Sequence, residues 1–497
     1  MVIYVNFILT INVLFMKKNS LLLLFGGLAT ISLAVLTNCT SESDAVVEET
    51  TTSTTPPADS LCFVSPSWFP HSQTPAPAEG VGSPFDVSST TNQIFHQWSW
   101  NKFLWLTKPD QGGNPLFLNQ STVKQVTTSM APVTIPTGTL VVLQDTAQAG
   151  SKSAVLQTNP DYNAGSGAMV YYSIHMNPEM ISSGIDFASQ IKSGTLPANN
   201  QTPFPVGSFE LKVAWVPAAA IPAAEQSSYY TAIASLSTNG GVSFENTEMA
   251  LIGMHVVGVV QNHPEFIWAT FEHDDLAPNY DWTANNASAS NDKLLYKKGT
   301  VTGINGIVYN TTTKLGIAPY QVFDLFQYGV PRNPDGTFMT TSQNGQTNFD
   351  NVAGINQCVK SQLNDVWKNY FYNGSLWLNT DGKTPQQQAQ LIDSLGYNIS
   401  SAIPGSFARG SLNCANVTME TFTQTFGTSI TSINVNSLAS CFSCHSAPSF
   451  SNSNNLSPLY LSHTFQGYLI QQQGNSSAKM EAIKLNAEKQ VVKRMLK

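Results

Sequence analysis

The 497-residue sequence predicts an α+β fold with a β-rich body, helical flanks and a helical C-terminal segment. Three observations predict it. Residues 130–350 contain short β-branched and aromatic runs bounded by Gly, Pro and Asn, which are typical of strands. Residues 92–109, ahead of this region, have apolar residues near helical spacing. Beyond residue 350, helical spacing returns together with helix-capping signals.

The first 38 residues are typical of a secretory signal peptide. Two lysines and an apolar run at 21–36 follow Met16, where the pattern starts afresh, so Met16 is the expected true start. The run ends in Leu-Thr-Asn-Cys, which resembles the lipidation box of bacterial lipoproteins. We therefore expect a lipid on Cys39 and a lipoprotein exported to the periplasmic face of a membrane or to the cell surface. An uncleaved membrane anchor is the alternative, since the run is near the minimum length for a span.

Three further regions follow the signal. Residues 39–88 begin with the lipidated cysteine and are rich in Ser, Thr, Glu and Pro, the composition of a flexible tether. Residues 89–410 form the predicted body, and 411–497 the C-terminal segment. The net charge is −8 and charged residues make up only 11% of the chain. Nucleic acid is therefore not an expected partner, because phosphate binding needs clustered Lys and Arg.

The body is expected to open with a buried helix over 92–109, whose three tryptophans are assigned to the core. Strands are then expected in TGTLVVLQD, GAMVYYSIHM, GSFELKVAWVP, MHVVGVVQ, EFIWATFEH and GIVYN. In the third of these, apolar residues alternate with Glu210 and Lys212. This alternation indicates a half-buried strand on which Glu210 and Lys212 are ordinary residues of the polar face.

Helices are expected after residue 350, over 352–373, 384–396, 456–473 and 476–497. The second has Thr384 as N-cap with Gln387 three residues later, which is a capping box. The third has Ser457 as N-cap and Pro458 at its first position.

The chemistry is expected at Cys441-Phe442-Ser443-Cys444-His445. Two cysteines three residues apart on one helical turn can each bond one vinyl group of haem, and the histidine that follows can be the proximal iron ligand. A zinc site would need four ligands and no second paired motif exists. A redox dithiol would need a βαβ unit, and the preceding residues are Ser-rich instead. The motif therefore predicts one covalent haem c, held by Cys441, Cys444 and His445.

The remaining cysteines in the exported chain are Cys62, Cys358 and Cys414. In an oxidising compartment two of them can pair. We expect a Cys358–Cys414 disulfide, with Cys62 left as a buried thiol.

The sixth iron ligand is expected to be His463, which lies 18 residues beyond His445 with Gly467 one turn away. Other candidates are Met480 and a pair of strand histidines, His255 and His273, with Met254, Met419 and Met495 also possible. A hairpin centred on His263 would pair residue 255 with residue 271 and place both strand histidines on one face. The expected reading of that pair is nevertheless a strand end with two polar residues, one solvated and one satisfied, and a two-histidine contact to a metal or haem is the alternative.

Several stretches together resemble a family of exported bacterial proteins described as cytochrome c family proteins: WSWNKFLWLT, GSFELKVAWVP, HPEFIWATFEHDDLAP, and NVTMETFTQ followed by SCFSCH. The resemblance spans roughly residues 90–465. It implies one c-type haem near the C-terminus of a large exported β-rich protein. Only Cys441, Cys444 and His445 carry over as functional residues.

The expected function is that of a membrane-tethered, single-haem electron-transfer protein with an unidentified redox partner protein. A haem enzyme with an open sixth site, for example one that uses peroxide, is the first alternative, because the body is much larger than a carrier needs. A surface binding module in which the haem is structural or sensory is the second.

Overall fold

A computed structural model describes residues 64–146, 156–163, 167–277, 286–296, 352–395, 416–419 and 441–474, apart from single positions within them, and short pieces of 298–316, 408–410 and 479–486. All of these belong to one compact unit, Pro57–Lys497. The predicted signal peptide, Cys39 and most of the tether lie outside the described residues. So does most of the predicted helix 476–497.

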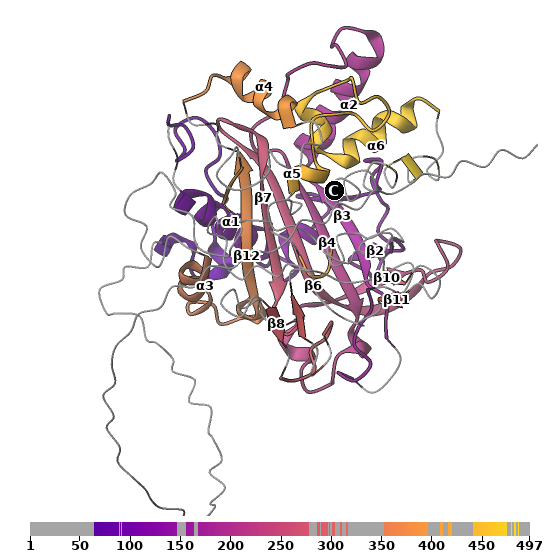
Figure 1. Cartoon of the computed structure of the whole chain (residues 1–497). Coiled ribbons are helices and arrows are strands. Elements are labelled where there is room, and N and C mark those ends of the chain that lie inside the picture. The colour runs from indigo at the N-terminus through magenta and orange to yellow at the C-terminus, as the bar shows by residue number, and fades with distance from the viewer. Residues whose placement is uncertain are drawn as a thin grey trace, which may run out of the picture. The chain divides into compact units, whose positions relative to one another are not determined.

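The centre of this unit is a nine-stranded sheet with the order β1-β3-β4-β6-β7-β12-β13, to which β5 is added beside β6, and β2 beside β5 (Figure 1). All pairings are antiparallel except β2 with β5. The strands are β1 Lys124–Val126, β2 Val141–Leu143, β3 Tyr171–Met176, β4 Phe209–Pro217, β5 Thr231–Leu236, β6 Glu245–Val260, β7 His263–His273, β12 Tyr370–Leu378 and β13 Ala408–Gly410. Two small hairpin sheets pair β8 Asn286–Ser288 with β9 Val301–Gly303, and β10 Tyr309–Asn310 with β11 Leu315–Gly316.

Helices accompany the sheet, and the predicted α+β class is confirmed. They are α1 Asn92–Thr107, α2 Pro178–Ser193, α3 Val352–Lys360, α4 Pro385–Leu395, α5 Cys441–Cys444 and α6 His463–Gln472, with a 3₁₀ helix η11 over Pro458–Leu461. The two sides of the sheet bury different cores. We call them the α1 face and the α6 face.

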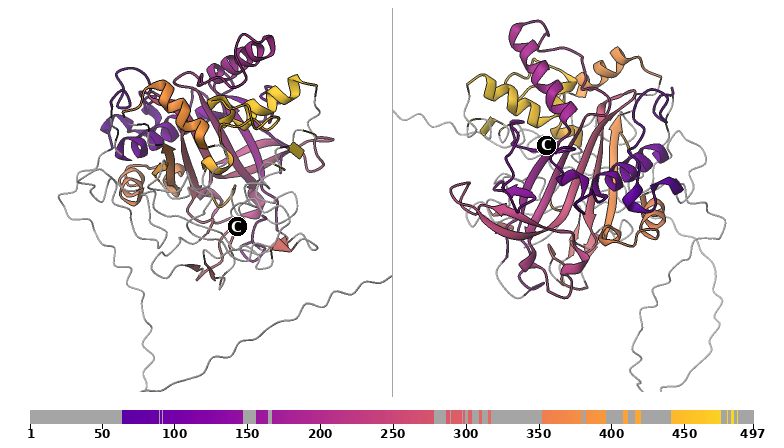
Figure 2. Two further views of the ribbon diagram at one scale, coloured as in Figure 1. Left: turned by 45° about the horizontal axis from the view of Figure 1, so that its top comes forward. Right: turned by 180° about the vertical axis from the view of Figure 1, so that it is seen from behind.

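The α1 face is an aromatic core between the sheet and α1, which Figure 2 shows against the sheet in the view from behind. Phe103 of α1 stacks on Phe271 of β7 with ring centroids 4.0 Å apart, and Trp100 meets the same ring edge-on. The predicted helix over 92–109 and the core assignment of its tryptophans are thus confirmed, with Trp98 and Trp100 buried.

The α6 face is covered by the C-terminal segment together with α2 and α4. Met176, Val257, Trp268 and Leu376 project from adjacent strands into this second core. Phe442 and Phe465 belong to the same core, so the segment that carries the CFSCH motif packs directly on the sheet.

The helix predicted over 352–373 is wrong in its second half. The helix α3 ends at Lys360, and Tyr370–Leu378 form strand β12, which pairs along β7. Tyr370 and Tyr372 are buried on the α1 face while Leu376 is buried on the other. A central strand that is buried on both sides tends to have a continuous run of apolar residues. Such a run cannot be told from a buried helix by periodicity alone.

The two other helix starts were predicted with different success. The capping box is confirmed: Thr384 N donates to Gln387 Oε1 at 2.9 Å, and Gln387 N donates to Thr384 Oγ1 at 3.3 Å. Ser457 does cap a helix, but that helix is only the 3₁₀ turn η11. Ser462 then caps a new helix, so His463 is the first residue of α6.

Candidate haem-attachment site

The CFSCH motif forms a single helical turn, α5, that is anchored by its apolar residue. His445 N donates to Cys441 O at 2.8 Å, which closes the turn. Phe442 is buried and meets the ring of Trp268 edge-on, with centroids 6.1 Å apart. Cys441 and Cys444 are half-buried, and neither is in a disulfide. Residues three apart in a helix lie on one side, so the two thiols share a side of this turn.

His445 is oriented by the backbone of η11. Its Nδ1 lies 2.8 Å from the carbonyl oxygen of Leu461. Because a carbonyl oxygen only accepts, Nδ1 must carry the proton, and the neutral ring then has its lone pair on Nε2. A hydrogen bond of this kind fixes the tautomer and ring orientation of metal-binding histidines. The indole of Trp268 packs against the ring at a centroid distance of 4.4 Å.

His463 lies beside His445 and parallel to it. The two ring centroids are 3.8 Å apart and their planes differ by 16°. Its Nε2 lies 3.0 Å from Cys444 O, to which it donates. Axial haem ligands approach the iron from opposite sides of the macrocycle, whereas stacked rings lie on one side. In this arrangement His463 contacts the motif through its stacking on His445 and its bond to Cys444 O. Its role as sixth ligand stays a prediction, and it would require α6 to move.

The loop between the motif and α6 is closed by its own hydrogen bonds. Gln466 is buried; its Oε1 accepts from Phe450 N and its Nε2 donates to Tyr460 O at 2.7 Å. Ser457 N donates to Ala447 O at 2.9 Å. These bonds hold η11, and with it the Leu461 carbonyl, in a fixed position relative to α5.

Glu210 on β4 ties α6 to the sheet, a role that its reading as an ordinary face residue missed. Its carboxylate accepts from Ser462 Oγ at 2.8 Å and from Thr464 Oγ1 at 2.5 Å. A carboxylate at a helix N-terminus is also favoured by the helix dipole. The signal available in the sequence was an acidic residue on the polar face of a strand, together with a serine at position 462 of a type that caps helices.

The predicted pairing of the strand histidines is wrong by one residue. The hairpin turns at Gln261-Asn262, where Asn262 has a φ of 64°, and His255 pairs with Thr270 rather than with residue 271. Asn tolerates this left-handed conformation. Val260 pairs with His263 at the turn, but Gly258 pairs with Ile267, so a register shift between them adds two residues to β7. The turn and this shift together move the pairing by one residue from that of a hairpin centred on His263. A slip of one residue moves a side chain to the other side of a sheet. His255 therefore lies on the α6 face and His273 on the α1 face.

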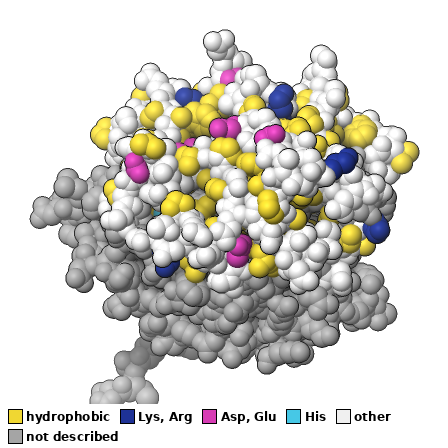
Figure 3. Space-filling model, turned by 90° about the horizontal axis from the view of Figure 1, so that it is seen from above, with side chains coloured by type: hydrophobic (Ala, Val, Ile, Leu, Met, Phe, Trp, Pro, Cys, Tyr) yellow, Lys and Arg dark blue, Asp and Glu magenta, His cyan; other side chains and the backbone are white. Residues whose placement is uncertain are grey.

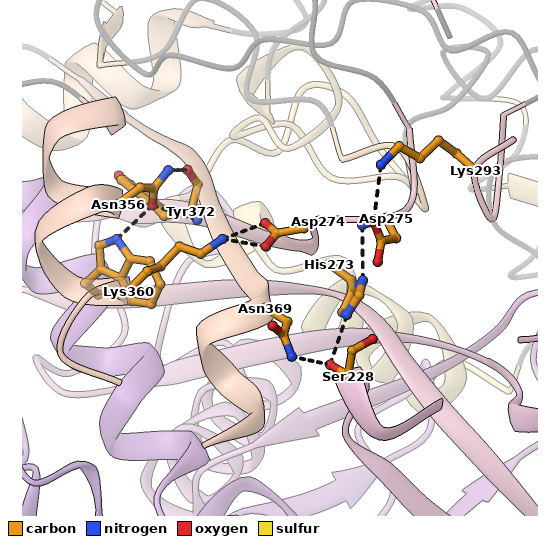
Figure 4. A network of polar contacts seen from close by, with 10 residues as sticks. Ser228, His273, Asp274, Asp275, Lys293, Asn356, Lys360, Asn369 and Tyr372 are labelled. Atoms are coloured by element: carbon orange, nitrogen blue, oxygen red, sulfur yellow. Dashed lines mark hydrogen bonds and ion pairs between the residues drawn. The ribbon is translucent and has the colours of Figure 1, made fainter. Parts of the chain in front are cut away.

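His273 is a satisfied buried residue (Figure 4). Its Nε2 donates to Ser228 O at 3.0 Å, its Nδ1 accepts from Asp275 N at 3.2 Å, and it stacks on Tyr229 at 3.5 Å. Burial lowers the pKa of His273 to about 4. The reading of this histidine as structural is confirmed.

Charged residues beside His273 form ion pairs with each other, as Figure 4 shows. Lys360 Nζ contacts both carboxylate oxygens of Asp274 at 2.6 Å, and Lys293 Nζ contacts Asp275 at 3.2 Å. Burial raises the pKa of Asp274, while Lys360 opposes that shift. The Lys360 pair joins the end of β7 to α3, and the Lys293 pair joins it to the segment 290–296.

The donor set at the motif fits covalent haem. Two unbridged thiols on one side of a turn, with an imidazole whose Nε2 carries the lone pair, are the groups that haem c attachment uses. In the described part of the chain, the motif included, no group of three or more His, Cys, Asp and Glu side chains is placed to hold a metal ion.

The end of the unit where α2, α4 and α6 lie carries scattered charges. Figure 3 views the end of the unit where α2, α4 and α6 lie, and shows hydrophobic side chains gathered among uncharged ones with scattered charges between them. Among the residues described, no helix is both long and apolar enough to cross a membrane.

Cys358 on α3 is disulfide-bonded. Cys441 and Cys444 are not in disulfides. The predicted partner, Cys414, lies outside the described residues, as does Cys62.

Searches with the chain find no matching family model, no matching curated protein and no matching solved structure. The resemblance to cytochrome c family proteins therefore stays a prediction.

Proposed function

We propose that this chain is a membrane-tethered, single-haem c-type cytochrome that transfers electrons outside the cytoplasm. Cys441 and Cys444 would form the thioethers, His445 would be the proximal ligand through Nε2, and the lipid on Cys39 would tether the protein to a membrane. The bound haem c would supply one-electron chemistry at its iron.

The observation that carries this proposal is the bond between His445 Nδ1 and the Leu461 carbonyl oxygen. A redox dithiol needs only its two sulfurs, and a structural zinc site needs four ligands. His445 follows the two cysteines directly, and a backbone carbonyl fixes its tautomer and ring orientation. This is what a histidine that binds iron needs.

The large body supports the same role by fixing the site. Trp268 packs against His445, and Glu210 holds the start of α6, whose first residue stacks on His445. Elements far apart in sequence thus determine where the proximal imidazole lies. A rigid site from which part of the water is excluded keeps the reorganisation energy of electron transfer small. It also influences the reduction potential of the haem.

The test is the optical spectrum of the purified holoprotein, oxidised and reduced, with and without carbon monoxide. An electron carrier should be reduced and reoxidised reversibly, and its low-spin spectrum should not change with carbon monoxide. Ready binding of carbon monoxide would favour the haem enzyme instead. A haem that cannot be reduced by any soluble donor would favour a structural role.

A further inference from the structure

The α6 face of the sheet has a regular set of rows near the motif. Cross-strand pairing places Glu210, Val257 and Trp268 side by side on β4, β6 and β7. This row carries the motif, because Glu210 binds α6 and Trp268 contacts His445. In Figure 1, α5 lies against the sheet near β7.

The next row on the same face consists of Lys212, His255 and Thr270. Each residue lies two positions along its strand from the row that carries the motif, which is about 6.6–7 Å. His255 is diagonal to Trp268, a relationship that places the two residues about 7–8 Å apart, with their Cβ atoms somewhat closer. Within the run Met249–Val260, His255 is half-buried and all other residues are buried. The imidazole is therefore partly open to solvent, and it stands in the row next to the one that contacts the motif.

A third row lies beyond His255, on the side away from the row that carries the motif. Gly253 and Glu272 lie there, and residues 416–419 pack on them: Val417 N donates to Glu272 Oε1 at 3.0 Å. Asn416 Nδ2 reaches Thr270 Oγ1 at 2.8 Å. His255 thus lies between the segment 416–419 and the segment that carries the CFSCH motif.

The other candidates for the sixth ligand are less well placed. Met254 and His273 lie on the α1 face, across the sheet from the motif. His463 is stacked on His445. Met419 is on the correct side but fully buried in the turn 416–419. Met480 and Met495 lie outside the described residues.

We propose that His255 is the sixth ligand of the haem iron, on the basis of its position on the sheet face that bears the motif. The inference rests on the proposed function, since it requires haem at Cys441 and Cys444. It assigns the β-rich body a direct part in the redox centre: the C-terminal segment supplies the proximal imidazole and strand β6 the distal one. Two imidazole ligands from separate segments would also tie the segment 441–474 to the sheet through the iron.

The experiment compares the holoprotein with His255→Ala and His255→Met, and uses His273→Gln as the matched control. The Gln side chain can donate to Ser228 O as His273 Nε2 does. Position 273 is on β7, the strand next to β6, and its side chain lies on the sheet face opposite that of His255. The wild type should be low-spin without the near-infrared band that sulfur ligation by Met produces. His255→Ala should become reactive toward carbon monoxide, and added imidazole should restore the low-spin spectrum. His255→Met should gain the near-infrared band, and His273→Gln should match the wild type.

Three results would overturn the assignment. A near-infrared sulfur band in the wild type excludes His255 even if no variant folds. An unchanged spectrum in His255→Ala also excludes it, and a simultaneous change in Met419→Leu would identify that residue as the ligand. A wild-type polypeptide without bound haem overturns the proposed function and the sixth ligand together. In the first two cases the haem is present, so the proposed function stands while the ligand assignment fails.

Discussion

The carboxylate of Glu210, the second residue of strand β4, lies 2.8 Å from the hydroxyl of Ser462, the N-cap of α6. The second carboxylate oxygen accepts a bond from Thr464. One acidic side chain thus joins the sheet to the helix that begins with His463, whose ring lies on His445. The position of the His445 imidazole therefore depends on a residue 235 positions earlier in the chain.

Replacing Glu210 with Ala should loosen the C-terminal segment. The change leaves two hydroxyls without their acceptor, at a cost of about 1–3 kcal/mol in the free energy of unfolding. Glu210→Gln keeps one acceptor oxygen and should cost less. Hydrogen exchange should rise in residues 441–474, and urea denaturation should report the loss. Lys212→Gln, the next residue on the same face, is the control; if it exposes the segment as much as Glu210→Ala does, the carboxylate is not the anchor.

Stability should fall as the pH is lowered from about 6.5 to 4. Burial lowers the pKa of His96 and His175 to about 3 and that of His273 to about 4. These folded-state imidazoles stay neutral while the unfolded chain takes up protons below its ordinary pKa of 6.5, so protonation favours the unfolded state. Each such histidine contributes a slope of up to about 1.4 kcal/mol per pH unit. Urea denaturation of His273→Gln at a series of pH values should show a slope smaller by about that amount, and an equal slope would contradict the buried, neutral state of His273.

The strand-rich centre and the helical ends could be predicted because local pattern determines them. The capping box at Thr384 and Gln387 and the helix α1 formed as their residues indicate. The strand Tyr370–Leu378 could not be separated from a helix by local pattern, because both of its sides are buried and no alternation appears. Its identity is decided by pairing with β7, a partner about a hundred residues away.

The candidate site also has one part that local sequence predicts and another that depends on contacts between distant residues. The motif itself could be identified from five residues, because covalent attachment needs its groups at fixed local spacing. The role of Glu210 and the side of the sheet on which His255 lies depend on long-range contacts and on register. The turn at Gln261-Asn262 and the register shift between Gly258 and Val260 together put His255 and His273 on opposite faces of the sheet, not on one face as predicted.

Peptide mapping under non-reducing conditions should recover Cys358 in a disulfide with Cys414. Loss of the bond through Cys358→Ala should lower the free energy of unfolding by about 2–5 kcal/mol, because the unfolded chain is no longer constrained. The Cys414→Ala variant should lose the same amount, since either change breaks the same bond. A peptide that links Cys358 to Cys62 would show that the predicted partner is wrong.

Cys39 should carry a lipid. Metabolic labelling with a fatty acid should mark the protein, and Cys39→Ser should release it from membranes into the soluble fraction. Cys62→Ser is the matched control and should leave both labelling and membrane association unchanged. Continued membrane retention of Cys39→Ser would indicate an uncleaved N-terminal anchor instead of a lipid.

Covalent attachment of haem at Cys441 and Cys444 is the central claim, and acid–acetone extraction followed by mass analysis of the polypeptide tests it most directly. The mature chain, produced with c-type maturation machinery, should retain one haem after extraction. Proteolysis should place that haem on the peptide that contains Cys441, Cys444 and His445, and Cys441→Ser with Cys444→Ser should abolish it, whereas Cys358→Ser should not. Recovery of all haem in the organic phase, or a polypeptide of unmodified mass, would contradict the account.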